Sequence, residues 1–181
     1  MSDTSYKHCP YSDEIPEDFY TEEWTGIIFK ADVYTRNGHY YKSEVLCRRL
    51  EDDWIKSLIS TGQLFGEFKY DDVNINNLHD TIRLHKVAIS FTDLWIDNNG
   101  SVFAKFKCVN NQYGKIIYDK LNKGLPVYFG IRCIGRCDEE CNIIDIYRII
   151  TFDIISSCPY NIELTDKTYP NGKYERILEV H

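Results

Sequence analysis

The chain has 181 residues and a mass of 21.3 kDa, enough for one compact domain and short for two. Its 43% hydrophobic and 27% charged residues are typical of a globular protein. The formal charge of −7 argues against a nucleic-acid partner, because phosphate contacts need an excess of lysine and arginine. No apolar run approaches the ~20 residues of a membrane-spanning helix, and no secretory signal is visible, so we expect no membrane partner and synthesis in the cytoplasm.

The segment 1–23 is both acidic and aromatic. Seven carboxylates there stand against Lys7 as the only lysine or arginine. Such a segment is typical of a solvated tail, and its aromatic side chains also suit an arm that docks on a neighbouring molecule. We therefore divide the chain into an arm at 1–23, a folded domain at 24–160 and a C-terminal hairpin or arm at 161–181.

The first half of the folded domain is predicted to form a strand, a long helix and a second strand. Residues 24–36 are rich in β-branched and aromatic side chains, which favours a strand, and Asn37-Gly38 favours a turn. Ser43 is placed to cap a helix that ends near Thr61, before a strand at 63–68. The helix positions expected to face the core are Leu46, Leu50, Trp54 and Leu58.

The second half alternates strands with one further helix. A polar loop at 71–80 is followed by strands, a hairpin turn, a helix whose apolar face should point inward, and two more strands. The predicted ranges are 86–97 and 101–109 for the first strand pair, 112–123 for the helix, and 126–135 and 143–155 for the last strands; the inward helix positions are Tyr113, Ile116, Ile117 and Leu121. Short strands joined by turns predict a β-rich α+β fold, with a bent, mainly antiparallel sheet or barrel and peripheral helices.

The seven cysteines are an odd number, which favours free thiols over a disulfide framework. Cys133, Cys137 and Cys141 form a C-x3-C-x3-C pattern. Its spacing fits neither zinc knuckles nor the common iron–sulfur motifs, and no histidine lies nearby as a fourth ligand. We therefore expect no metal and no cofactor.

Five groups of residues then carry a resemblance. They are, in chain order, Asn37-Gly38-His39-Tyr40-Tyr41; Leu64-Phe65-Gly66-Glu67-Phe68-Lys69-Tyr70; Thr92-Asp93-Leu94-Trp95 with Val102-Phe103-Ala104-Lys105; Tyr113-Gly114-Lys115-Ile116 with Lys123-Gly124-Leu125; and Thr151-Phe152-Asp153-Ile154-Ile155. In the same order they resemble the N-G-R-x-Y, L-x-G-E-L-D-H, T-D-L-W with V-x-G-K, G-K-I and F-D-I-V motifs of the tailed-phage prohead (capsid maturation) proteases, relatives of the herpesvirus assembly protease. The resemblance spans about residues 25–160 and implies a prohead protease-like fold.

The family's chemistry needs a serine nucleophile, a histidine base and a group that orients the histidine. The resemblance places the histidine position on Tyr70, whose phenol has a pKa near 10 and cannot act as a base at neutral pH. The two serine positions fall on Gly130 and Ile131. The family's S-H pair, which precedes T-D-L-W, falls on Ala88 and Ile89. Arg132 is retained. These positions are degenerate, so we expect no catalytic residue among them.

A displaced active site is the alternative. His79 or His85 could approach Cys133, which lies three residues beyond the lost serine position, but the odd spacing turns its side chain to the other strand face. A Cys133–His85 dyad is therefore disfavoured. Ser156 and Ser157 are expected to be turn serines.

These losses predict a pseudo-protease kept for its surface: a non-enzymatic phage head protein that binds the major capsid protein lattice as an auxiliary or decoration protein of the virion. The alternatives are an active maturation protease that cleaves scaffold and capsid proteins, an internal scaffold or core protein, and an unrelated β-rich interaction domain. A homo-oligomer of this chain is a further possible assembly. The acidic charge favours the capsid exterior, because packaged DNA repels it. Candidate capsid contacts, which could equally pack on the protein's own body, are Tyr11, Phe19, Tyr20, Trp24, Tyr169 and Tyr174.

Overall fold

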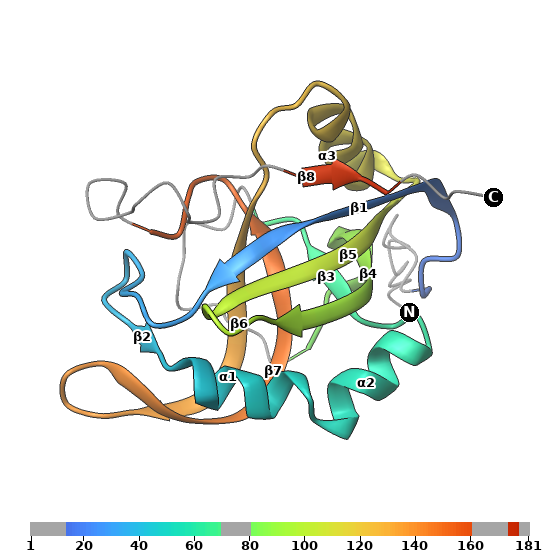
Figure 1. Ribbon diagram of the computed structural model, residues 1–181. Helices are drawn as coiled ribbons and strands as arrows, with labels where there is room; N and C mark the ends of the chain where they lie inside the picture. The colour runs from blue at the N-terminus through green and yellow to red at the C-terminus, as the bar shows by residue number, and fades with distance from the viewer. Residues whose placement is uncertain (1–13, 70–80, 161–173, 178–181) are drawn as a thin grey trace, which may run out of the picture.

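The computed structural model describes residues 14–69, 81–160 and 174–177 as two β-sheets with peripheral helices (Figure 1). The strands are β1 (Phe19–Lys30), β2 (Tyr40–Tyr41), β3 (Phe65–Glu67), β4 (Val87–Ile96), β5 (Ser101–Val109), β6 (Tyr128–Cys137), β7 (Asn142–Ile155) and β8 (Tyr174–Arg176). The helices are α1 (Ser43–Leu50), α2 (Asp53–Ser60), α3 (Gln112–Asn122) and the 3-10 turn η2 (Leu84–Lys86). None of the described helices is long and apolar enough to cross a membrane.

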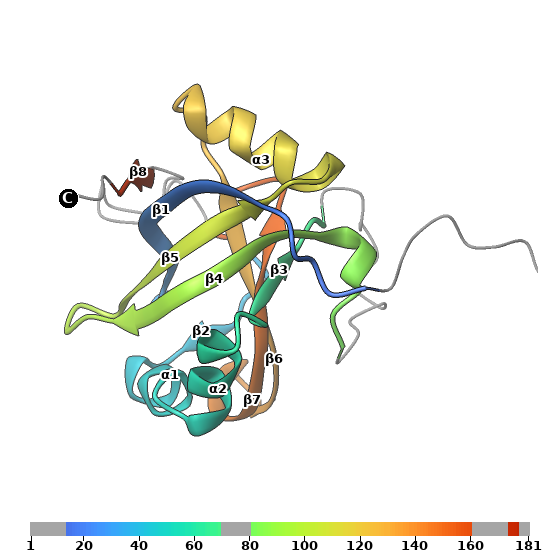
Figure 2. The ribbon, with the colours of Figure 1, turned by 90° about the vertical axis from the view of Figure 1, so that its right-hand side faces the viewer.

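The larger sheet has the order β3-β4-β5-β1-β8 and is antiparallel throughout, while the smaller has the order β2-β7-β6 with β2 parallel to β7. The sheets meet where Phe68 bridges to Ile154 and where the Thr151 hydroxyl donates to the Phe65 carbonyl. Figure 2 shows α3 along one side of the β4–β5 pair and α1 and α2 on the other, beside β7. The predicted β-rich α+β class with mainly antiparallel sheets is confirmed.

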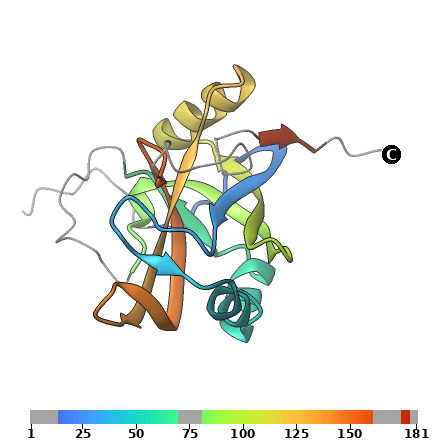
Figure 3. The same ribbon diagram turned by 60° about the vertical axis from the view of Figure 1, so that its left-hand side comes forward.

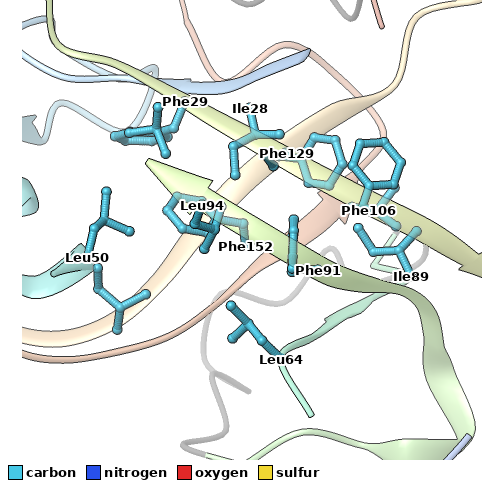
Figure 4. Close-up of a cluster of buried hydrophobic side chains, with 14 of the residues drawn as sticks. Ile28, Phe29, Leu50, Leu64, Ile89, Phe91, Leu94, Phe106, Phe129 and Phe152 are labelled. Atoms are coloured by element: carbon cyan, nitrogen blue, oxygen red, sulfur yellow. The ribbon is translucent and has the colours of Figure 1, made fainter. Parts of the chain in front are cut away.

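Phenylalanine rings from both sheets fill the core (Figure 4). Phe91 and Phe106 of the larger sheet face Phe129 and Phe152 of the smaller, with ring centroids 5.7–6.4 Å apart. The rings are tilted or edge-on, the arrangements that aromatic quadrupoles favour. The sheets are thus held together by one shared apolar core.

The single helix predicted for 43–61 is wrong: the chain forms two helices that break at Asp52. Asp52 is extended (φ −62°, ψ 143°), and its carboxylate accepts the Trp54 backbone N–H at 2.9 Å, which starts α2 afresh. Ser43 is the first residue of α1 rather than its cap, and its N–H is bound at 2.9 Å by Asp32 Oδ1. The break turns Trp54 out of the core, with 47% of its surface exposed.

Helix α3 follows the prediction at both ends. Asn111 Oδ1 accepts the N–H groups of Tyr113 and Gly114 at 3.0 and 2.8 Å and fixes the start of the helix. Gly114 lets the helix approach β5, because a Cβ there would lie 1.9 Å from the Val109 carbonyl oxygen. The exception is Ile116, which is exposed rather than facing the core.

The strand bounds shift most at the two ends of the domain. β1 begins at Phe19 and ends at Lys30, whereas the sequence predicted 24–36, so its first residues belong to the segment assigned to the arm. β8 pairs with β1 near Trp24. The predicted hairpin turn at 170–172 lies outside the described residues.

Candidate functional site

A cleft of about 500 Å3 is lined by the turn before β2, the paired strands β6 and β7, and the turn after β7. Figure 3 shows the light-blue segment that leads into β2 beside the orange β6–β7 hairpin. Arg36 N–H donates to the Pro159 carbonyl at 2.7 Å, and Thr35 bridges to Tyr160, which brings segments far apart in sequence to one rim. Gly130 and Ile131, at the expected serine positions, both line this cleft.

A buried cluster of charges reaches the floor of the cleft through Lys69, Arg132 and Asp153. Arg132 Nη2 donates to Asp153 Oδ1 at 2.9 Å and to a carboxylate oxygen of Glu67. The other Glu67 oxygen accepts from Arg83 Nε at 2.7 Å, and Lys69 Nζ lies 3.6 Å from Asp153 Oδ2. The side chains of Arg132, Glu67 and Asp153 are at most 5% exposed. Each buried carboxylate therefore has a cation against it, as burial of charge requires.

The two buried carboxylates respond differently to this environment. Burial alone would raise the pKa of Glu67, but Arg132 and Arg83 outweigh it and hold the pKa below its usual value. For Asp153, burial dominates over Arg132 and Lys69 and raises the pKa. The same cluster therefore shifts the pKa values of its two carboxyls in opposite directions.

The structure does not bring Cys133 and His85 into one site. The Cys133 thiol contacts the Tyr41 hydroxyl, and burial raises its pKa to about 11. At neutral pH this group is a protonated thiol, which is a poor nucleophile. His85 lies in η2 and lines a different cavity, beside Val109 and Asn111. His79 lies outside the described residues.

The other predicted positions that the structure describes do not line the cleft. Ile89 is fully buried on β4 and packs over Gly66 in the core. Tyr70 lies outside the described residues. Cys133 is half-buried while Cys137 and Cys141 are exposed, and no three His, Cys, Asp or Glu side chains among the described residues are grouped to hold a metal.

The candidate capsid contacts within the described residues pack mainly on the protein itself. Tyr20 stacks on Tyr118 with ring centroids 3.9 Å apart, and Trp24 is 5% exposed beneath the Arg176 guanidinium. Tyr174 donates to the Val127 carbonyl at 2.8 Å. Phe19 packs on a small apolar cluster of Phe65, Val87 and Val109; Tyr11 and Tyr169 lie outside the described residues. Capsid contact by these side chains stays a prediction.

The sequence did not single out several residues that line the cleft. Arg36 Nη1 donates to Ser157 Oγ at 3.2 Å and to the Cys158 carbonyl at 3.3 Å, and His39 and Lys69 lie on the same lining. Arg36 and Ser157 are 121 residues apart, so no local pattern could have paired them. The available signal was the resemblance itself, which covers His39 and Lys69 within two of its motifs.

The two sheets, the cleft beside β6 and the peripheral helices define a β-rich α+β protein with a prohead protease-like fold. No family model and no curated protein matches the chain. Among solved structures, the chain is similar to the bacteriophage T4 capsid assembly protease, gp21, with a TM-score of 0.62 and 18% sequence identity over 81% of this chain and 91% of that one. The likeness confirms the predicted fold.

Proposed function

We propose that this protein is a non-enzymatic phage head protein on an inactivated prohead-protease fold, which binds the major capsid protein lattice as an auxiliary or decoration protein. The observation that carries the proposal is the lining of the cleft. At the positions where the resemblance expects a nucleophile, β6 presents Gly130 and Ile131, neither of which can attack a peptide bond.

The floor of the cleft supports the same proposal. Acyl transfer needs a base poised to take a proton from a nucleophile. Here the two buried carboxylates, Glu67 and Asp153, are paired with cations, and Cys133 has a pKa of about 11. A fold that keeps its core and loses its chemistry is kept for its surface. A solved relative in fold is named as a capsid assembly protease, so the head of a tailed phage is the setting in which that surface would act.

Co-sedimentation with purified heads tests the proposal. The intact protein is mixed with empty and with DNA-filled heads of its own phage and pelleted. We expect it to pellet at a saturating ratio to the major capsid protein and to leave that protein uncut. Failure to bind either kind of head, with a correctly folded sample, would contradict the decoration role. Cleavage of the capsid protein would contradict the non-enzymatic role.

An active maturation protease is the second candidate, because the cleft holds His39, Ser157 and Cys158 together. Ser157 Oγ accepts a hydrogen bond from Arg36, an interaction that offers no base for its proton. The candidate predicts labelling by a fluorophosphonate or a thiol-directed peptide probe that Ser157→Ala or Cys158→Ala abolishes. Absence of labelling under conditions that label a control protease leaves the non-enzymatic proposal.

A further inference from the structure

The outer edge of β1 is closed by the C-terminal part of the chain. β8 pairs with β1 through three residue pairs, and Thr25 opposite Glu175 is the central one (Figure 3). The Ile177 N–H donates to the Glu23 carbonyl at 2.9 Å and extends the contact by one step. Among the described strands, β8 pairs with β1 alone and so ends the larger sheet. The edge of β1 is therefore a site that holds an extended peptide segment.

Tyr174 anchors β8 in a socket of core residues. Its ring centroid lies 5.6 Å from that of Phe106 and 5.8 Å from that of Phe129, and both of these phenylalanines are buried. Its hydroxyl donates to the Val127 carbonyl at 2.8 Å. A ring packed edge-on against two others, with its hydroxyl bonded at the far end, is a specific anchor as well as an apolar one.

Arg176 makes the second side-chain contact of β8. Its guanidinium carbon lies 5.0 Å from the centroid of the Trp24 ring, a cation–π contact, and it donates to Asn122 Oδ1 at the end of α3. The partners of Tyr174 and Arg176 thus belong to β1, β5, β6, α3 and the segment between α3 and β6. The site for β8 is built entirely by the body of the domain.

The connection that leads to β8 is long for the gap that it crosses. It begins after Tyr160, whose hydroxyl accepts the Lys30 N–H at 2.6 Å and donates to the Lys30 carbonyl at 2.9 Å. The Tyr174 hydroxyl meets the Ile27 carbonyl at 3.4 Å, and three residues of a strand span ~10 Å. Thirteen residues, 161–173, lie between the two tyrosines and can reach ~45 Å when extended. This length allows β8 to reach an edge of β1 other than its own.

We propose that β8 of one copy exchanges with β8 of a second copy and fills the same place on the partner's β1. The structure identifies the occupant, because Tyr174–Arg176 is the segment that the site holds. An exchanged strand makes the same contacts as before, so the closed and exchanged forms differ mainly in the entropy of association. A tethered segment has an effective concentration in the mM range, and exchange should therefore rise as the chain approaches that concentration. This exchange does not rest on the proposed capsid role.

Exchange links copies in one of two ways. Two chains that swap reciprocally close as a dimer, whereas a strand passed from copy to copy gives an open chain. In both arrangements the Tyr174 of one copy lies between Phe106 and Phe129 of another, so the second copy completes the core of the first. The same pair of strands therefore reports on either arrangement.

A disulfide trap between positions 25 and 175 tests the proposal on the full chain. Opposed residues of antiparallel strands have Cα atoms ~4.5–5.5 Å apart, which a disulfide can span. One chain carries Thr25→Cys and a second, 15N-labelled chain carries Glu175→Cys; in both, the exposed Cys137 and Cys141, and Cys9 outside the described residues, are replaced by serine. The two are equilibrated at about 1 mM and then oxidised. We expect a disulfide-linked dimer of twice 21.3 kDa, in which peptide mass spectrometry finds positions 25 and 175 joined, and its yield should fall on dilution before oxidation.

Lys105→Cys in place of Glu175→Cys is the matched control. Lys105 also lies opposite Thr25, but on β5 inside the sheet, where it cannot leave, so this mixture should give no dimer above the background of random collision. Tyr174→Ala on the chain with Glu175→Cys should lower the dimer yield about tenfold or more, because it removes the anchor while the partner chain keeps its own intact β8.

The pair Thr25→Cys/Glu175→Cys within one chain checks folding and pairing, and it should close as a monomer at low concentration. Its failure to close would overturn the proposal, because β8 would then not lie on β1. With that pair closing, a dimer yield no higher than that of the Lys105→Cys mixture would overturn exchange and leave β8 on its own chain. A yield that Tyr174→Ala leaves unchanged would also overturn it.

Discussion

Replacing Arg132 by methionine is the most informative change to the floor of the cleft. The guanidinium bridges Glu67 and Asp153, and the three side chains are at most 5% exposed. In Arg132→Met, Glu67 keeps Arg83 at 2.7 Å, but Asp153 keeps only Lys69 at 3.6 Å. Removing one partner of a buried ion pair costs ~3–5 kcal/mol, because a charge is left buried without compensation. We expect this loss in the free energy of unfolding at pH 7.

The pH dependence of the stability loss in Arg132→Met distinguishes a stranded buried charge from a simple packing defect. In the wild type the pKa of Glu67 lies below its ordinary value of 4.5, so the stability it contributes is present above that value and is lost as the pH falls through the folded pKa. In Arg132→Met the carboxyls lose their main cation, their folded pKa values rise, and protonation then relieves the buried charge. The difference between wild type and variant should therefore shrink as the pH falls from 7 toward about 5.

Urea unfolding followed by tryptophan fluorescence, at pH 7 and at mildly acidic pH, measures both effects. Arg132→Met/Asp153→Asn serves as the matched control, because it removes the charge that the first substitution strands and should recover part of the loss. A variant within about 1 kcal/mol of the wild type at pH 7 would refute the reasoning, since this is far below the cost of an uncompensated buried charge. A penalty that grows on acidification would refute it as well.

Four further outcomes follow, two from the packing, one from the thiol chemistry and one from the proposed role of the N-terminal arm. Leu50→Ala should cost ~2–5 kcal/mol in unfolding experiments, whereas Trp54→Ala should cost less than about 1, because Leu50 is 4% exposed and Trp54 47%; equal costs would place both on one helix face. Gly114→Ala should lower the melting temperature markedly, because its Cβ would lie 1.9 Å from a backbone oxygen, and an unchanged midpoint would reject the close approach of α3. The Cys133 thiol, with a pKa of about 11, should resist iodoacetamide at neutral pH until the protein unfolds, as mass spectrometry of the alkylated peptides would show. Deleting residues 1–17, which precede β1, should weaken binding to heads while leaving the melting curve cooperative; undiminished binding would remove the arm from the proposed contact.

The elements that the sequence predicted well are those fixed by neighbouring residues. The β4–β5 hairpin turns where Asp97 Oδ1 accepts the N–H groups of Asn99 and Ser101 at 2.9 and 2.8 Å. Helix α3 starts where Asn111 caps it. In both cases a short polar side chain binds backbone groups within four positions, so the local sequence contains the whole signal.

The elements that the sequence missed depend on contacts between distant residues. The apolar spacing runs without interruption through 43–61, so periodicity alone could not reveal that Asp52 is extended and restarts the helix. The cleft joins Arg36 to Ser157, and its floor joins Glu67 to Arg132 and Asp153, from three different strands or strand ends. Such sites are assembled by the topology of the sheets, and the resemblance in motif order was the route by which part of the site could be anticipated.

The most direct test of the proposed function is the copy number and integrity of this chain in purified mature virions, measured by quantitative mass spectrometry against the major capsid protein. The account predicts full-length chains in a fixed ratio to the capsid lattice. A chain that is absent, scarce or clipped in mature virions would contradict the decoration role. That result would favour an internal assembly protein or an active protease, and would direct attention to Ser157 and Cys158 in the cleft.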